Sequence, residues 1–221
     1  HQLVERGELE LDAPVARYWP EFAQKGKASI PVRMLLNHRA GLAAVTRPLS
    51  PEDLFDWATM TRALEEQEPW WEPGADHGYH ALTYGWLVGE LIRRVSGMSV
   101  GRYVREHIAA PLGAEFWIGL PEELDARTAE LHQGPISSDG PNLMERIAAE
   151  PEGVLAKAFG NPPLLLMSPN TRAWRAAELP AANGHTTAPA LARIYAALAS
   201  GGELDGVRIL RRETIERARE E

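Results

Sequence analysis

The chain has 221 residues, of which 44% are hydrophobic and 24% are charged, as in an ordinary globular protein. Its 23 Lys and Arg against 31 Asp and Glu give a formal net charge of −8, which argues against nucleic acid or an anionic membrane surface as a partner. The absence of cysteine excludes disulfides, thiol nucleophiles and Cys-ligated zinc, and no apolar run reaches the length of a membrane span.

The first part of the chain is predicted to form short helices. Residues 1–6 resemble the end of a helix that stops at Gly7, and residues 32–38 form a short apolar segment with Gly41 just beyond it. A third helix is predicted to start at Ser50, since its hydroxyl can cap a helix and the Pro that follows suits the first helical position. Its apolar stripe has helical spacing: Leu54, Trp57, Ala58, Thr61 and Leu64.

The clearest helix is predicted over residues 79–97, with Tyr79 at its start and Gly97 as its stop. Gly85 and Gly89 lie four residues apart within it. Glycine costs stability in a helix, so this pair predicts a close backbone approach to a neighbouring element. One broad face is apolar: Leu82, Trp86, Leu87, Leu91, Ile92 and Val95.

Two more helices and a hairpin are predicted towards the end of the chain. Ser99 caps a helix that Pro111 closes, and residues 187–201 form another, with a face made of Leu191, Ile194, Tyr195 and Leu198. Asp205-Gly206 predicts a tight turn in a hairpin near 203–210. Residues 131–184 lack periodicity, which is typical of a functional loop or lid. One mainly helical domain over 1–221 is the favoured organisation.

A metal site is one reading of the histidines. Asp76, His77 and His80 give D-H-x-x-H, so a metallohydrolase with bound zinc is one hypothesis. Zinc sites usually need a third protein ligand, and no H-E-x-x-H occurs in the chain. We therefore favour structural roles for both histidines and predict no metal and no organic cofactor.

No S-x-x-K nucleophile motif is present in the sequence, since none of its serines has a lysine three residues later. The letters G-x-S-x-G occur once, at residues 97–101, where Ser99 is the predicted cap of the next helix. A tyrosine such as Tyr79 is a poor base at neutral pH unless a neighbouring cation and a helix N-terminus make it more acidic. The N-terminus of its own predicted helix is expected to supply the second of these two effects. Taken by position alone, such a tyrosine is more often structural, with its ring packed and its hydroxyl bonded to the backbone.

Five blocks of the sequence resemble the serine β-lactamase-like superfamily, which includes class C β-lactamases, D-alanyl-D-alanine carboxypeptidases and family VIII carboxylesterases. The blocks run in the family's order over nearly the whole chain: VRMLLNHRAGL, W-x-P-G-x-x-x-x-Y, GYHALTYGWLVGELIRRVSG, REHIAAPLGAEFWIGLPEE and NGHTTAPALARIYAALASGGELDG. The esterase branch is the most similar. The resemblance implies the helical region of an α/β β-lactamase/DD-peptidase-like fold.

The family builds its site from S-x-x-K, from Y-x-N and from a K-T-G-like strand, and only the second motif matches here, at Tyr79-His80-Ala81. The resemblance implies that Tyr79 is the general base that helps to activate the serine. Ala81 replaces the Asn whose amide can hold a β-lactam or peptide, which favours esters. His185 is expected to border the substrate pocket, with a plain loop histidine before a helix cap as the alternative.

The resemblance also implies that the chain is an internal segment, incomplete at both ends, with S-x-x-K upstream and the K-T-G-like motif downstream. The main hypothesis is a serine hydrolase that cleaves a small ester through an acyl-enzyme. The alternatives are a non-catalytic helical binding or scaffold module and β-lactamase or DD-peptidase activity. The sequence leaves the oligomeric state open, and the compartment is unknown, with the cytoplasm favoured.

Overall fold

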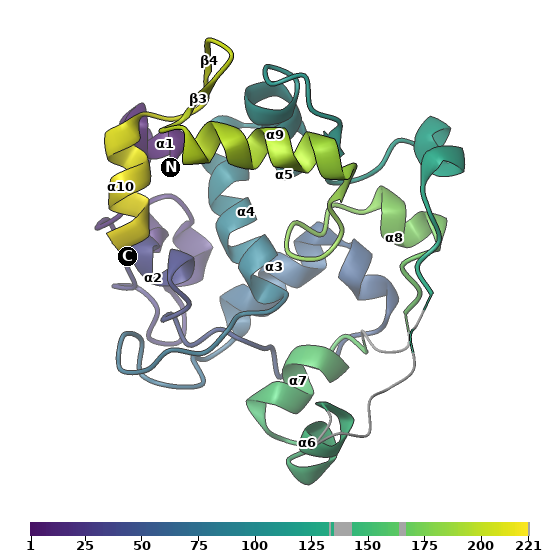
Figure 1. The fold of residues 1–221 in the computed structure, drawn as a ribbon. Coiled ribbons are helices and arrows are strands. Elements are labelled where there is room, and N and C mark those ends of the chain that lie inside the picture. Colours follow the sequence, from purple (N-terminus) through teal and green to yellow (C-terminus); the bar gives the residue numbers. More distant parts are fainter. Residues whose placement is uncertain (133, 135–142, 164–166, 221) are drawn as a thin grey trace.

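The structure is a computed structural model and describes residues 1–132, 134, 143–163 and 167–220. Short helices dominate it (Figure 1). The α-helices are α1 Gln2–Glu5, α2 Val32–Leu36, α3 Trp57–Glu66, α4 Thr83–Ser96, α5 Val100–Val104, α6 Leu143–Ala149, α7 Val154–Gly160, α8 Arg172–Ala176, α9 Ala188–Ala199 and α10 Arg212–Glu220. The 3-10 segments are η1 Val15–Arg17, η2 Pro20–Ala23, η3 Glu52–Phe55 and η5 Glu122–Arg127, and η4 Arg105–Ala109 is a π-helical extension of α5.

Two small antiparallel sheets join distant and neighbouring segments. Strand β1 (Phe116–Trp117) pairs with β2 (His185–Thr186), and β3 (Glu203–Leu204) pairs with β4 (Val207–Arg208). The second pair is the predicted hairpin, and both residues of its turn have positive φ, 50° at Asp205 and 79° at Gly206. A two-residue turn of this kind matches the twist of the strands.

Helix α4 lies at the centre of the main hydrophobic core and contacts α1, α2, α3 and α5 (Figure 1). Trp86, Leu87 and Leu91 on its buried face are each no more than 2% exposed. Other core side chains come from segments spread over the first half of the chain and include Trp19, Phe22, Ile30, Leu35, Leu42, Leu54, Met60 and Leu64. In the described residues no helix is both long and apolar enough to cross a membrane.

The two glycines of α4 allow the predicted close approach. A Cβ atom on Gly85 would lie 2.9 Å from the backbone nitrogen of Ala181, and one on Gly89 would lie 2.6 Å from the Trp57 ring. Either distance is too short for a side chain. The glycines therefore place α3 and the loop around Ala181 directly against α4, as the spacing predicted.

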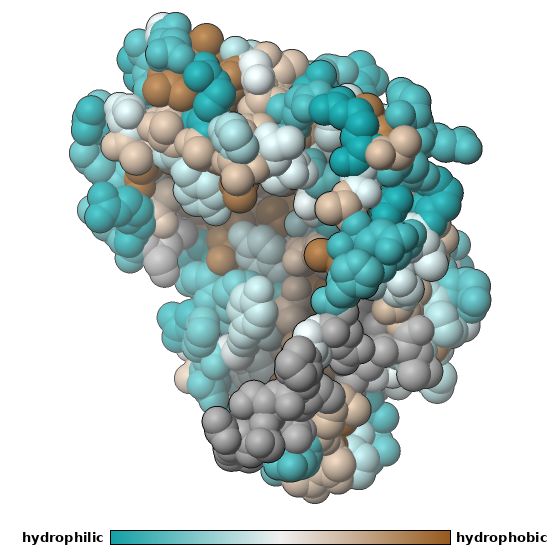
Figure 2. Space-filling view, turned by 45° about the vertical axis from the view of Figure 1, so that its right-hand side comes forward, coloured by the Kyte–Doolittle hydropathy of each residue, from teal (hydrophilic) through white to brown (hydrophobic). Residues whose placement is uncertain are grey.

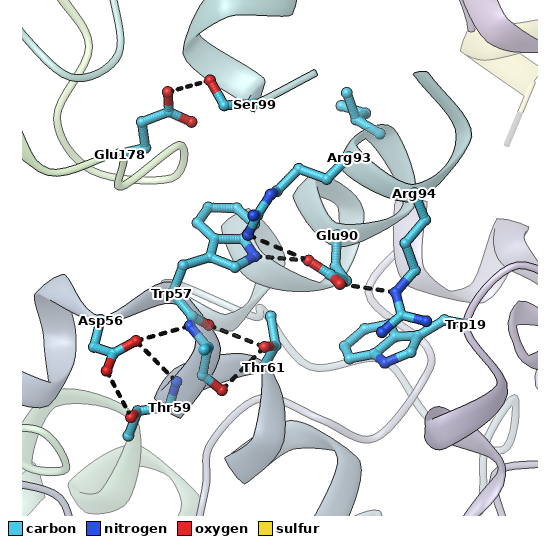
Figure 3. Close-up of polar contacts among 12 residues, drawn as sticks. Trp19, Asp56, Trp57, Thr59, Thr61, Glu90, Arg93, Arg94, Ser99 and Glu178 are labelled. Atoms are coloured by element: carbon cyan, nitrogen blue, oxygen red, sulfur yellow. Dashed lines mark hydrogen bonds and ion pairs between the residues drawn. The ribbon is translucent and has the colours of Figure 1, made fainter. Parts of the chain in front are cut away.

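A polar network around Glu90 joins α4 to α3 and to the N-terminal segment (Figure 3). Trp57 Nε1 donates to one Glu90 carboxylate oxygen at 2.7 Å, and Arg94 Nε donates to the other at 2.8 Å. Arg94 also reaches Glu21 at 2.7 Å, and Arg93 lies over the Trp57 ring. The Glu90 side chain is only 11% exposed. Its carboxylate thus accepts hydrogen bonds from one charged and one neutral donor inside the packed structure.

The predicted helix starting at Ser50 begins later, at Trp57. Ser50 and Asp53 exchange hydrogen bonds between side chain and backbone, which close the short 3-10 turn η3 instead. The Asp56 carboxylate then accepts from the backbone N–H groups two and three residues on and caps α3 (Figure 3). Aspartate at this position satisfies N–H groups that lack helical partners.

Other boundaries and faces also differ from the expectations. The helix predicted from residue 79 starts at Thr83, although it ends at Gly97 in the left-handed conformation as expected. Helix α9 packs through Ala190 and Ala197, so part of its predicted core face points outward, with Leu191 37% and Tyr195 64% exposed. The region 131–184 contains α6, α7 and α8, and its residues 133, 135–142 and 164–166 lie outside the described part.

Candidate active site

Tyr79 lies in the turn before α4, four residues ahead of Thr83, so the prediction that it opens the helix is wrong. Its side chain is 71% exposed and makes no hydrogen bond to the described residues. The ring is therefore not packed into the interior, which was the structural alternative. Its ring contact is with His38, at a centroid separation of 5.1 Å.

His38 holds the backbone on both sides of Tyr79. Its carbonyl oxygen accepts from the Gly78 N–H at 3.2 Å, and its ring Nδ1 accepts from the His80 N–H at 3.2 Å. His38 thus accepts hydrogen bonds from the residues on either side of the tyrosine. These bonds join the backbone here to the segment after α2 and leave it outside the α4 helix.

His80 fixes the same turn from inside. Its ring is fully buried, with Nε2 accepting from the Leu42 N–H at 3.0 Å and Nδ1 donating to the Gly78 carbonyl at 2.5 Å. Accepting at Nε2 requires the proton on Nδ1 when the ring is neutral. Both nitrogens are engaged with the backbone, and the described residues contain no cluster of three ligands for a metal ion. His80 is therefore a structural histidine in this fold.

Trp71 packs against the turn that carries Tyr79. A Cβ on Gly78 would lie 2.5 Å from the Trp71 ring, and the Trp71 ring meets His80 edge-on at 5.9 Å. Gly41 has φ 74°, and a Cβ there would lie 2.7 Å from the Trp71 carbonyl oxygen. Glycine is the residue that tolerates both this conformation and this contact. The exposed tyrosine is thus carried by a closely packed support.

Two rings of this cluster, His38 and Tyr84, have pKa values shifted so that the neutral form is favoured. Burial lowers the pKa of His38 below its usual value, and the neighbouring His77 lowers it further. Burial raises the pKa of Tyr84, whose ring lies 4.9 Å from that of His38. His38 therefore does not supply a cation that would activate the Tyr79 phenol.

The three lysines of the chain do not supply that cation in the structure either. Lys27 is buried and donates to the carbonyls of Glu65 and Gln67, at the end of α3. Lys157 pairs with Glu152 at 2.9 Å, and Lys25 lies in the exposed turn beside Lys27. No described contact joins a lysine to Tyr79.

We expect the buried His80 ring to make the protein acid-sensitive. The pKa of His80 is lowered from 6.5 to about 4, mainly by burial. The hydrogen bond to Gly78 raises this pKa, and the neighbouring His38 and His77 lower it. Between these values the unfolded chain binds a proton that the folded chain does not. Stability is therefore full above pH 6.5 and falls as pH drops towards 4, by about 2 kcal/mol at pH 5 at ~1.4 kcal/mol per pH unit.

Melting temperatures of the full-length protein at pH 7 and pH 5 measure this effect. His80→Gln keeps an acceptor for the Leu42 N–H but does not titrate, so its melting temperature is expected to fall several degrees less than that of the wild type. An equal fall in both proteins would mean that His80 does not set the acid limit.

A second candidate region is a pocket of about 460 Å³ between residues 115–131 and 169–187. The side chains of two tryptophans and three leucines give it an apolar wall: Trp117, Leu120, Leu124, Leu131 and Trp174. The face in Figure 2 is hollowed near its middle, with apolar residues at the back of the hollow among hydrophilic ones. Pockets that are mostly apolar with few polar groups are typical of small-molecule sites.

Most polar side chains around the pocket are already bonded within the protein. Asn170 exchanges two hydrogen bonds with the backbone of Leu131, and Arg127 makes a two-pronged ion pair with Glu115. The Asn183 amide bonds three backbone groups and is only 3% exposed. The surface left for a ligand is accordingly apolar.

His185 lines this pocket. That His185 borders a substrate pocket stays a prediction. Its Nδ1 atom is buried and has no hydrogen-bond partner among the described residues. Burial lowers the pKa of His185, and the nearby Arg175 and Arg172 lower it further. The Asn183 backbone and Asp125 raise it by less, so the net shift is downward. The ring is therefore neutral at pH 7 and can donate or accept one hydrogen bond.

The loop before β2, part of which lines the pocket, is attached to α4 and to the start of α5. Glu178 accepts from the Ser99 hydroxyl at 2.6 Å and from the Gly101 N–H at 3.1 Å, which attaches the loop before β2 to the start of α5 (Figure 3). In the same loop, Ala181 packs on Gly85. Tyr79 is not among the residues that line the pocket, and the structure shows no contact between Tyr79 and His185.

The model of the Beta-lactamase family matches residues 1–221. The chain belongs to this family. Esterase/beta-lactamase LipL of Mycobacterium tuberculosis is 38% identical over 229 residues, which cover 97% of this chain and 51% of that protein. A putative D-alanyl-D-alanine carboxypeptidase of Escherichia coli is 30% identical over 126 residues, covering 51% of this chain and 28% of its own length.

Solved structures give the same result for the fold. A family VIII carboxylesterase matches 97% of this chain and 55% of its own with 39% identity and a TM-score of 0.85. EstA from Arthrobacter nitroguajacolicus Rue61a matches 96% and 56% with 37% identity and a TM-score of 0.81. The described helices thus form a helical region of this β-lactamase-like fold, and the resemblance to the esterase branch is confirmed. The chain spans about half the length of these relatives.

The role of His38 is not apparent from the sequence. Among the residues that the structure describes, it is one of three non-glycine residues with positive φ, at 61°, and the block NHRAGL indicates only a helix end and a family feature. A histidine just after a short helix carries no signal that it will contact a turn 40 residues later. The pairing depends on tertiary structure that local patterns do not encode.

Proposed function

We propose that the full-length protein is a serine hydrolase that cleaves small carboxylic esters through an acyl-enzyme, with Tyr79 as the general base. The observation that carries the proposal is the exposed Tyr79 phenol on a turn fixed by hydrogen bonds on both sides. Membership of a family whose relatives include named esterases supports it. A fixed base beside the reacting atoms is what general-base catalysis requires.

The proposed reaction needs two groups from outside these 221 residues, a serine and a lysine of an S-x-x-K motif. The serine oxygen attacks the ester carbonyl carbon while its proton passes to the Tyr79 oxygen, whose negative charge the lysine favours. The alcohol then leaves with a proton, and the acyl group stays on the serine. Water attacks the acyl-enzyme in the second step and releases the acid.

His185 and its pocket are proposed to bind the uncharged part of the ester. The apolar wall suits an alkyl or aryl group, and the neutral His185 ring offers one hydrogen bond to a polar atom. Ala81 stands where the family pattern has an amide side chain. A substrate amide would therefore lack that partner, which favours esters over β-lactams and peptides.

A substrate panel on the full-length protein tests this proposal. Turnover of 4-nitrophenyl acetate and butyrate is expected, with turnover of nitrocefin and of a D-alanyl-D-alanine peptide at least 100-fold lower. Hydrolysis of the peptide or the β-lactam at comparable rates would support the β-lactamase or DD-peptidase alternative. No turnover of any of them, by a folded protein, would support the non-catalytic module.

Filling the pocket tests its part in binding. Leu124→Trp adds an indole to the wall, so the KM for the butyrate ester is expected to rise about 10-fold while that for the acetate ester changes less than 3-fold. An identical change in KM for both esters would show that the pocket does not hold the acyl group. Leu143→Trp, on an exposed position of α6, is the matched control and is expected to change neither value.

A further inference from the structure

We propose that His38 is a positioning residue that holds the Tyr79 phenol in its productive orientation. The inference rests on the function proposed above for Tyr79. It depends on one juxtaposition: a single residue bonds the backbone before and after Tyr79 and places its ring against the tyrosine ring.

The backbone of the turn is fixed by His38 at two points. The Gly78 N–H donates to the His38 carbonyl, and the His80 N–H donates to the His38 ring nitrogen Nδ1, both at 3.2 Å. The tyrosine lies between these two donors. Its Cα position is therefore set from both sides, even though the segment belongs to no helix or strand.

The side chain of Tyr79 needs a further restraint. It is 71% exposed and makes no hydrogen bond to the described residues, so the backbone alone leaves its rotamers open. The His38 ring lies 5.1 Å from the tyrosine ring at an interplanar angle of 57°. Tilted contacts at such distances are favourable between aromatic rings. A displacement of about 1 Å at a reacting group can cost roughly 100-fold in rate, so this contact matters for catalysis.

His38 is itself held firmly. Its ring lies 4.9 Å from that of Tyr84 and 5.4 Å from that of His80, and the buried His80 is bonded to Leu42. The backbone of His38 has φ 61°, a conformation that few residues with a side chain adopt. A residue kept in this conformation by its surroundings is a typical feature of functional sites.

The histidine also has the right hydrogen-bonding state at neutral pH. Nδ1 must be unprotonated to accept from the His80 N–H, which places the proton of the neutral ring on Nε2. Burial and the neighbouring His77 lower the pKa of His38, so this neutral form is the one present at pH 7. His38 thus restrains the tyrosine without adding a charge beside it.

Substitution of His38 in the full-length protein separates the contribution of its ring contact from that of its hydrogen bonds to the backbone. His38→Asn keeps the backbone carbonyl, supplies Oδ1 as an acceptor for the His80 N–H and tolerates positive φ, but it lacks the ring. We expect kcat for 4-nitrophenyl butyrate to fall about 10-fold with KM changed less than 2-fold. His77→Asn is the matched control, because it removes another ring that lies near His38, at a centroid separation of 6.1 Å, and it is expected to leave kcat unchanged.

A double variant shows whether His38 acts through the tyrosine. If it does, His38→Asn lowers kcat in the wild type but has no further effect in Tyr79→Phe. Equal effects of His38→Asn in both backgrounds, or no effect in the wild type while Tyr79→Phe is impaired, would overturn the positioning role alone. Unchanged activity of Tyr79→Phe would overturn the proposed base as well, so the two failures are distinguishable.

A second variant covers the case in which His38→Asn does not fold. His38→Gly adopts the same backbone conformation without strain and leaves a space the size of the ring. Added imidazole is expected to restore at least half of the lost kcat in His38→Gly and to have no effect on Tyr79→Phe. Failure of imidazole to restore activity to a folded His38→Gly protein would contradict the role of the ring.

Discussion

Replacing Tyr79 with Phe in the full-length protein is expected to lower kcat/KM for 4-nitrophenyl butyrate by about 10²–10⁴-fold, the usual contribution of a general base. The substitution removes one oxygen and keeps the ring that contacts His38. Because Tyr79 is 71% exposed and its hydroxyl has no hydrogen-bond partner among the described residues, the melting temperature is expected to stay within about 1 °C. KM is expected to change less than 3-fold, since the phenol acts in the transition state.

Tyr195→Phe is the matched control for this experiment. Tyr195 is 64% exposed on α9, and the same oxygen is removed. We expect its kcat/KM to remain within 2-fold of the wild type. A loss as large as that of Tyr79→Phe would mean that hydroxyl loss has a general effect unrelated to the turn. Near-normal activity of Tyr79→Phe would remove this residue from the mechanism.

Replacing Glu90 with Leu is expected to have the largest effect on stability. The change leaves the Trp57 N–H and the Arg94 guanidinium without their shared acceptor, in a site where the Glu90 side chain is only 11% exposed (Figure 3). Removing one partner of a buried ion pair costs roughly 3–5 kcal/mol. We discount this to about 3 kcal/mol because Arg94 is 29% exposed and also reaches Glu21.

Thermal melting of the full-length protein measures the expected loss as a fall of several degrees in the melting temperature. Glu90→Gln keeps an acceptor for Trp57 and is expected to lose less than Glu90→Leu. Glu123→Leu is the control, since Glu123 is exposed and makes no ion pair to the described residues. If Glu90→Leu and Glu123→Leu melt at the same temperature, the network does not stabilise the fold.

Periodicity and turn chemistry predicted much of the fold. The apolar face of α4, the Ser99 cap of α5, the stop at Gly97 and the Asp205-Gly206 turn depend on neighbouring residues, and the structure has all of them. The glycine pair in α4 predicted a close approach for a similar reason, because a helix includes glycine at a cost only where a neighbour needs the space.

Tertiary competition explains the boundaries that were wrong. Asp56 was not recognised as the cap of α3, because Ser50 offers the same chemistry six residues earlier. Residues 79–82 have a helix-like pattern, yet the N–H of His80 bonds His38 instead of an α-helical partner. Local propensity cannot show which of two possible partners a backbone group will find in the folded protein.

The candidate site was predictable only in part. The resemblance pointed to Tyr79 and His185. The catalytic role of Tyr79 and the substrate-binding role of His185 stay predictions. His38 and His80 matter through partners 38–42 residues away in the sequence, which spacing rules do not reach. D-H-x-x-H suggested a metal site, although His80 uses both nitrogens to hold the backbone. The residue types in the sequence showed where groups with acid–base chemistry lie close together, and the folded contacts showed which of them hold the backbone.

The most direct test of the account is a single-turnover measurement with the full-length protein in excess over 4-nitrophenyl acetate, which reports serine acylation alone. We predict rapid release of 4-nitrophenol by the wild type, a stable mass increase of one acetyl group on a serine after acid quenching, and release at least 100-fold slower in Tyr79→Phe. Acylation at the wild-type rate in Tyr79→Phe, or turnover without any acetyl-serine, would contradict the account.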